Sequence, residues 1–151
     1  MRYVFYFLAF SFSLLAETPE YDFAGRHFLA SYLDCDKEAL SDVEALSLAM
    51  DLAVQSSGAT LLDKCEHLFP PHGLTLLYLL SESHASIHTY PEHGACFVDL
   101  FTCGDHCSAE EFDRVLRTYL QPQNVDSHLF TRGEKTRLVS CSEGHDRGPF
   151  R

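Results

Sequence analysis

Apolar and polar residues alternate along several short stretches of the chain, and this period of two predicts β-strands. The clearest stretch is Ala85–Tyr90, in which Ser86, His88 and Tyr90 fall on the same face. The stretch Thr75–Leu80 is a run of apolar residues, a pattern typical of a strand that is covered on both sides. Further strands are predicted over residues 26–33, 60–69, 96–102 and 125–130.

Two other stretches have the helical period, and each begins with a capping box, in which a serine is followed three residues later by a glutamate. The boxes are Ser41–Glu44 and Ser108–Glu111, and the helices end at Gly58 and before Pro122. The apolar faces consist of Val43, Leu46, Met50, Ala53 and Val54 in the first helix and Phe112, Val115, Leu116 and Tyr119 in the second. These elements predict an α+β fold, a two-layer sandwich of a mainly antiparallel sheet with two helices packed on one face.

Composition limits the classes of partner. A chain of 151 residues with 46% hydrophobic residues is long enough for one globular domain. Its net charge of -11 argues against nucleic acid and against a stable membrane partner, because phosphate groups are bound by clustered Lys and Arg. A cationic small molecule would be attracted instead.

The cysteines predict neither a disulfide framework nor a metal site. Their spacings match no small disulfide scaffold, so reduced thiols are expected. Cys103 and Cys107 with His106 between them lack the paired spacing of structural zinc, and no metal is expected. The six cysteines are Cys35, Cys65, Cys96, Cys103, Cys107 and Cys141.

Three segments are expected along the chain. Residues 1–20 form an apolar extension that is either a secretory signal, a peripheral anchor, an added strand or the result of a mis-assigned start, and it is too short to span a bilayer. Residues 21–133 form the domain, and residues 134–151 form a loose tail rich in glycine and charge.

The tripeptide Glu82-Ser83-His84 carries the main chemical signal. A serine hydroxyl can attack the carbonyl that precedes it and convert the amide to an ester, if a base and a strained backbone assist. Elimination and hydrolysis then leave a pyruvoyl group. The run Glu82–Glu92, followed by Phe101-Thr102-Cys103-Gly104, closely resembles the S-adenosylmethionine decarboxylase proenzymes of bacteria and archaea, and the resemblance extends over residues 25–133.

The resemblance implies a role for each motif residue. Cleavage between Glu82 and Ser83 would leave covalent pyruvate, derived from Ser83, as the only organic cofactor, and this group forms a Schiff base with the substrate amine. His88 would be the base in processing, and Cys103 would donate the proton to the substrate carbon. From the residues alone, Cys103 is not distinguished from Cys96 or Cys107.

The remaining positions are implied more indirectly. Phe69 and Tyr90 would stack against the substrate, and Glu92 would hold its ribose hydroxyls. Thr75 stands where many relatives have serine, and with His84 it would support processing, although His84 could also merely shape the turn. Tyr90 replaces the usual tryptophan, and the bulky residues after Thr75 would narrow the pocket.

The implied function is a self-processing decarboxylase of S-adenosylmethionine that supplies the aminopropyl donor for spermidine biosynthesis. The alternative is the same chemistry on ornithine or arginine, and a less favoured one is an uncleaved, non-catalytic protein. Relatives of this type form homodimers that share active-site residues, so a dimer of cleaved protomers is expected. The resemblance also implies a cytoplasmic enzyme, whereas residues 1–20 would direct export if they are a true signal.

Overall fold

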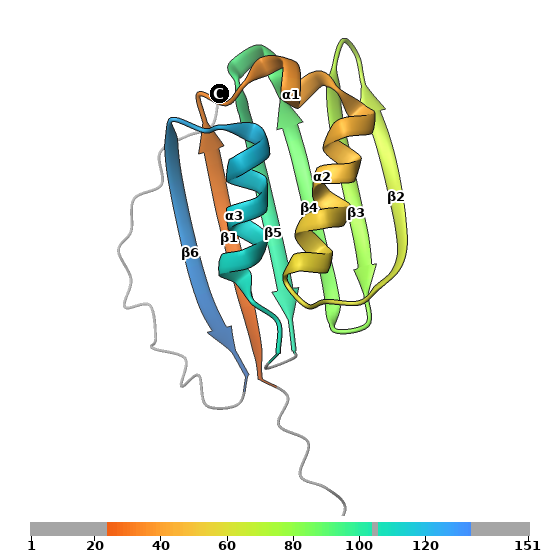
Figure 1. The fold of residues 1–151 in the computed structure, drawn as a ribbon, viewed down its shortest axis with the longest axis vertical. Coiled ribbons are helices and arrows are strands. Elements are labelled where there is room, and N and C mark those ends of the chain that lie inside the picture. The colour runs from red at the N-terminus through yellow and green to blue at the C-terminus, as the bar shows by residue number, and fades with distance from the viewer. Residues whose placement is uncertain (1–23, 104–105, 134–151) are drawn as a thin grey trace, which may run out of the picture.

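Six strands form one antiparallel sheet in the order β2-β3-β4-β5-β1-β6 (Figure 1). The structure is a computed structural model that describes residues 24–103 and 106–133. The apolar extension and the tail expected from the sequence lie outside these residues. The strands are β1 (Gly25–Leu33), β2 (Leu61–Phe69), β3 (Gly73–Leu80), β4 (Ser83–Tyr90), β5 (Ala95–Thr102) and β6 (Asn124–Arg132).

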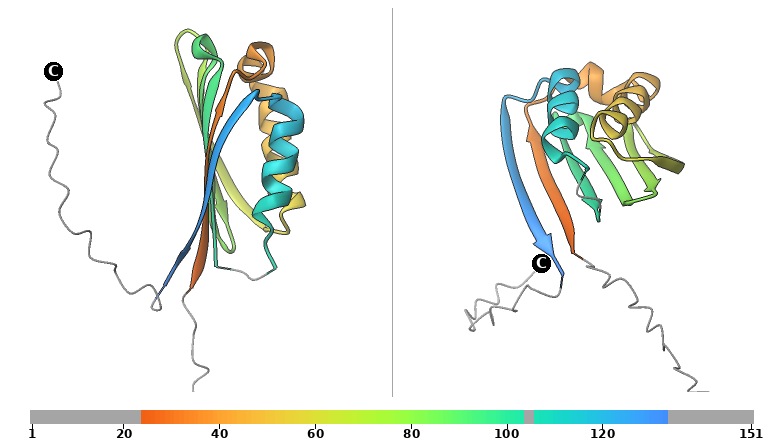
Figure 2. Two further views of the ribbon diagram at one scale, coloured as in Figure 1. Left: turned by 90° about the vertical axis from the view of Figure 1, so that its left-hand side faces the viewer. Right: turned by 60° about the horizontal axis from the view of Figure 1, so that its bottom comes forward.

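The helices cover one face of this sheet and leave the other face open (Figure 2). This arrangement confirms the predicted two-layer α+β sandwich with a mainly antiparallel sheet. Among the described residues, no helix is long and apolar enough to cross a membrane. The helices are α1 (Lys37–Ser41), α2 (Val43–Ser56) and α3 (Ala109–Leu120), and a 3-10 turn, η1 (Pro91–His93), joins β4 to β5.

The start of the first predicted helix is corrected by the structure. Ser41 is not its N-cap but the last residue of α1, a short helix that the sequence pattern did not reveal because five residues are too few for a period. Asp36 caps α1, and the Asp42 side chain accepts a hydrogen bond from the Ala45 amide at the start of α2. The second predicted box is confirmed, since the Ser108 side chain accepts from the Glu111 amide.

The hydrophobic core lies between the sheet and the helices. Leu76, Tyr78 and Leu80 of β3 point into it and are buried. Leu77 and Leu79 alternate with them and are 49% and 55% exposed, so the prediction that β3 is covered on both sides is wrong for the single chain. An apolar run reveals low polarity but not the number of layers, because the covering layer comes from elsewhere in the fold.

The uncovered side of the sheet, which we call the open face, carries a row of exposed apolar side chains. The strand pairings place Leu77, His88 and Phe97 on this same face. A monomeric protein rarely exposes so many large apolar groups together. The large exposed members include Phe69, Leu77, Leu79, Tyr90, Phe97 and Phe130.

Candidate active site

The turn between β3 and β4 holds the candidate cleavage bond. Ser83 pairs with Leu80 across the hairpin and with Thr102 of β5, so both neighbouring strands fix its backbone. Its φ is +153°, a value that residues with a side chain rarely adopt. Such a backbone costs on the order of 1–3 kcal/mol, and the surrounding strands must maintain it. The bond between Glu82 and Ser83 therefore leads into a strained residue.

The carbonyl group of this bond is held by the next strand. The Cys103 amide donates a hydrogen bond of 3.1 Å to the carbonyl oxygen of Glu82. Attack on a carbonyl carbon places negative charge on its oxygen, and a backbone N–H that already points at that oxygen stabilises the charge. The Cys103 side chain is exposed.

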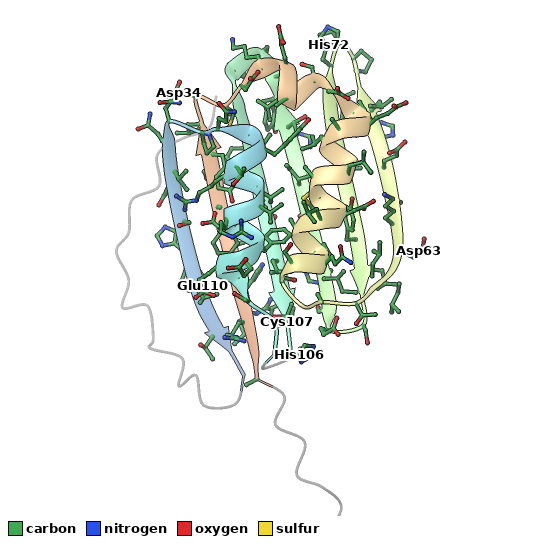
Figure 3. All side chains as sticks on the ribbon, in the orientation of Figure 1. Asp34, Asp63, His72, His106, Cys107 and Glu110 are labelled. Carbon is green, nitrogen blue, oxygen red and sulfur yellow. The ribbon has the colours of Figure 1, made fainter. Side chains whose placement is uncertain are left out.

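The Glu82 side chain is held by two further groups. One carboxylate oxygen accepts a hydrogen bond of 2.9 Å from the Thr60 amide, and the other lies 3.5 Å from Nε2 of His106. The side chain is 10% exposed, and the Thr60 amide is the main cause that lowers the pKa of Glu82. Figure 3 shows His106 at this end of the molecule and His72 at the opposite end. The carbonyl oxygen and the side-chain carboxylate of Glu82 are thus both held beside the candidate bond.

The hydroxyl group of Ser83 faces the following residue. Its Oγ lies 3.0 Å from Nδ1 of His84. The His84 ring contacts the Phe101 ring at 5.7 Å between centroids and lies 6.4 Å from the His27 ring. Burial lowers the pKa of His27, so this neighbour is protonated less readily than an ordinary histidine.

A second group of predicted residues surrounds His88. Its Nδ1 lies 2.5 Å from the Thr75 hydroxyl, and its ring lies 5.5 Å from Phe69 and 4.5 Å from Tyr90 between centroids. All four side chains lie on the open face. Glu92 follows in η1, where its side chain is exposed and 3.8 Å from His93. The structure thus brings the predicted aromatic contacts together with the predicted processing base.

The two groups are far apart in one protomer. His88 follows Ser83 by five positions along β4, which at about 3.3 Å per residue separates their Cα atoms by about 16 Å. Glu82, Ser83, His84 and Cys103 therefore form one cluster at the β3–β4 turn, which we call the cleavage cluster. Phe69, Thr75, His88 and Tyr90 form another, which we call the His88 cluster.

The sequence did not single out the two groups that anchor Glu82. Thr60 is only the first residue of the strand predicted over residues 60–69, and His106 is considered only together with Cys103 and Cys107 as a metal ligand. Their contacts with Glu82 join segments 22 residues before it and 24 residues after it, and no local pattern encodes such contacts. In the described ranges no group of three or more metal-ligating side chains could hold an ion.

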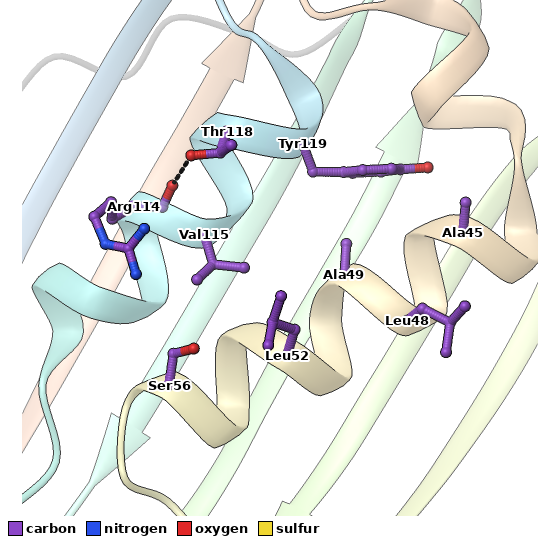
Figure 4. Close-up of a pocket in the computed structure, with 9 residues that line it drawn as sticks. All are labelled: Ala45, Leu48, Ala49, Leu52, Ser56, Arg114, Val115, Thr118 and Tyr119. Carbon is purple, nitrogen blue, oxygen red and sulfur yellow. Dashed lines mark hydrogen bonds between the residues drawn. The ribbon is translucent and has the colours of Figure 1, made fainter.

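Two grooves differ in their relation to these clusters. A groove of about 620 Å³ separates α2 from α3 and is lined mainly by apolar residues such as Leu48, Leu52 and Val115 (Figure 4). None of the candidate active-site residues lines it. A groove of about 350 Å³ on the open face is lined by Leu77, Leu79 and His84, so it reaches the cleavage cluster.

Comparisons with known proteins agree with this picture. A family model described as S-adenosylmethionine decarboxylase matches residues 26–133, which contain both clusters. The chain is 48% identical over 107 residues to the S-adenosylmethionine decarboxylase proenzyme of Fervidobacterium nodosum, covering 70% of this chain and 78% of that protein. It is 42% identical over 110 residues to the proenzyme of Thermosipho melanesiensis, covering 73% and 85%.

A solved structure is similar as well. The crystal structure of the adenosylmethionine decarboxylase from Aquifex aeolicus superposes with a TM-score of 0.69 and 32% sequence identity. The match covers 85% of this chain and 100% of that one.

Proposed function

The chain belongs to the S-adenosylmethionine decarboxylase family, and we propose that it cuts itself between Glu82 and Ser83 and then decarboxylates S-adenosylmethionine. The product is the aminopropyl donor for spermidine biosynthesis. The observation that carries the proposal is the strained backbone of Ser83, combined with the Cys103 amide on the carbonyl oxygen of Glu82.

The residues of the cleavage cluster fit a pyruvoyl group derived from Ser83. The Ser83 hydroxyl lies beside a possible base, and the carbonyl group that it would attack is already polarised. The pyruvoyl group supplies a carbonyl that binds the substrate amine and accepts the electron pair released with carbon dioxide. Cys103 would hold a proton for the substrate carbon, since its side chain is exposed and its backbone amide contacts the cleavage bond.

The substrate class agrees with the charge and the aromatic residues. A net charge of -11 attracts a cation, and Phe69 and Tyr90 present ring faces to a sulfonium group. The relatives described above are all named for S-adenosylmethionine, and none of them favours ornithine or arginine.

A homodimer would complete the active site. Within one protomer, His88 lies about 16 Å from Ser83 along β4, which is too far for it to act on that residue. The open face exposes the apolar side chains of a typical interface core. In the proposed dimer the open faces of two protomers are in contact, and the two-fold axis lies between these faces, perpendicular to the strands. This axis reverses the direction of the strands in the partner subunit. The partner's His88 cluster would therefore lie over the cleavage cluster.

Mass spectrometry tests the proposed function. Purified full-length protein should consist of two chains divided between Glu82 and Ser83, with the second chain blocked at its amino end. The same sample should release labelled carbon dioxide from carboxyl-labelled S-adenosylmethionine and not from ornithine or arginine. A single intact chain that releases no label would contradict the proposal, and release from another amino acid would reassign the substrate.

Mixed dimers test the shared site. The variants Ser83→Ala and His88→Ala are each expected to remain uncleaved when produced alone. In a dimer of the two, the His88→Ala chain keeps its own serine and meets the intact histidine of the other chain, so this chain alone should be cleaved. Absence of cleavage in isolated mixed dimers would contradict a shared site.

A further inference from the structure

The hydroxyl group that starts self-cleavage needs a base, and the structure places an imidazole beside it. We infer that His84 is the catalytic residue that takes the proton from the Ser83 hydroxyl in the first step, which leaves His88, the processing base expected from the family resemblance, for the later elimination. The inference rests on the proposed self-cleavage and assigns its two proton transfers to different histidines. The contact that supports it is the 3.0 Å distance between Ser83 Oγ and His84 Nδ1.

The geometry suits a base at this position. When the proton of the neutral imidazole is on Nε2, Nδ1 accepts the hydrogen bond from the Ser83 hydroxyl. The ring is held in place by Phe101, which lies opposite His84 in the pairing of β4 with β5. The neighbouring His27 ring lies 6.4 Å away, and burial lowers its pKa, which favours its uncharged form beside the positive charge that His84 acquires.

His88 is less suited to the first step. Within a protomer it is about 16 Å from Ser83, and its Nδ1 is already in contact with the Thr75 hydroxyl. A partner subunit could bring a second His88 to the cleavage cluster, but His84 is present at hydrogen-bond distance before any dimer forms. The first proton transfer therefore needs no group from outside the cleavage cluster.

In the first step, the amide between Glu82 and Ser83 is converted to an ester, and every atom is accounted for. Ser83 Oγ bonds to the carbonyl carbon of Glu82 while its proton moves to Nδ1 of His84. The oxygen that becomes negative accepts the hydrogen bond from the Cys103 amide. As the bond from this carbon to the Ser83 nitrogen breaks, His84 returns the proton to that nitrogen. The products are an ester and a free amine, and His84 is neutral again.

The second step uses a different proton. A base removes the proton on Cα of residue 83. The main-chain carboxylate of Glu82, formed from the ester, leaves with the electron pair of the Cβ–O bond and becomes the new C-terminus. Water then replaces the nitrogen of the resulting dehydroalanine, which releases ammonia and leaves the pyruvoyl carbonyl. No oxidant is consumed. Because only this step needs the second base, the loss of His88 should stop the chain at the ester.

Hydroxylamine distinguishes the two steps, because it cleaves esters rapidly and amides slowly. The variant His88→Ala should accumulate the ester, so hydroxylamine should split it into two chains. The variant His84→Ala should remain an amide that resists hydroxylamine, and its cleavage should be about a hundredfold slower than that of the unmodified protein. The double variant should resist like His84→Ala, and added imidazole should restore ester formation in both variants that lack His84.

Three further variants keep the test decisive. His72→Ala, at the far end of the sheet, should be cleaved like the unmodified protein (Figure 3). His84→Gln retains a side chain that forms hydrogen bonds but cannot act as a base, so it separates the positioning of the Ser83 hydroxyl from proton transfer. It also replaces His84→Ala in the test if that variant does not fold. Ser83→Ala has no hydroxyl and gives the background reaction with hydroxylamine.

Ester formation at the unmodified rate in His84→Ala or in His84→Gln would overturn the inference. If the unmodified protein itself remains one chain, the proposed function fails instead, so the two failures are distinguishable.

Discussion

The Cys103 amide lies 3.1 Å from the carbonyl oxygen of Glu82, so the end of β5 contacts the bond that we propose is cut. The contact arises because β5 ends beside the β3–β4 turn, where Thr102 pairs with Ser83. In the proposed reaction, Cys103 therefore serves self-cleavage through its backbone amide and decarboxylation through its side chain.

Replacement of the Cys103 thiol should separate these two roles. In Cys103→Ala the amide is retained, so we expect self-cleavage to slow by less than about tenfold, while decarboxylation falls at least about a hundredfold because the proton donor is absent. The measurements are the half-time of chain cleavage and the turnover of fully cleaved protein. Thr118→Ala, at an exposed position of α3 in the helical layer, is the control and should change neither. Normal turnover by Cys103→Ala would exclude the thiol as proton donor.

The Thr75 hydroxyl should affect elimination rather than ester formation. It lies 2.5 Å from Nδ1 of His88 and orients that ring. We expect Thr75→Val to accumulate the hydroxylamine-sensitive ester, with a loss of about tenfold or more in the rate at which the pyruvoyl chain appears. Thr75→Ser keeps the hydroxyl and should behave like the unmodified protein. Equal rates in the valine and serine variants would show that this contact does not contribute.

The anchored carboxylate of Glu82 predicts a specific dependence of stability on pH. Hydrogen bonding from the Thr60 amide holds the pKa of Glu82 below its ordinary value of 4.5. The resulting stabilisation is complete above pH 4.5 and is lost as the pH falls through the lowered pKa of the folded state.

The measurement compares Ser83→Ala with Ser83→Ala/Glu82→Gln, because neither can cleave itself. The difference in their free energy of unfolding should shrink as the pH falls below 4.5. A constant difference between pH 7 and pH 3 would contradict the anchoring role of the carboxylate.

The buried hydroxyl of Tyr78 should contribute modestly to stability. It donates to Asp51 at 2.8 Å, and burial is the first cause that raises its pKa, so it remains a donor at alkaline pH. In the Ser83→Ala background we expect Tyr78→Phe to lower the free energy of unfolding by about 1 kcal/mol, because Asp51 keeps its ion pair with Lys64. Denaturant unfolding measures the change, and Lys64→Ala, which breaks an exposed pair, should cost less.

The starts of the two longer helices were not equally predictable from the sequence. Ser108 and Glu111 form a cap within four consecutive residues, so the start of α3 was predictable from local pattern. The same reasoning misplaced the start of α2, because Asp36 and Asp42 each cap a helix and the serine of the apparent box ends the first one. Both readings fit the sequence, and only the backbone path selects one.

The sequence by itself determined the two periods that specify a sheet and two amphipathic helices, and it marked Ser83 as a serine that could attack the carbonyl group before it, whereas Cys103 was singled out by the family resemblance. These signals are local, because strand alternation, helix caps and a reactive serine beside its own carbonyl all involve residues close in the chain. Tertiary structure decided which face of β3 is covered and that the Cys103 amide and the Thr60 amide both hold Glu82. It also divided the motif between two clusters, because an extended strand separates Ser83 from His88 by its length, whereas pairing brings β5 to Glu82.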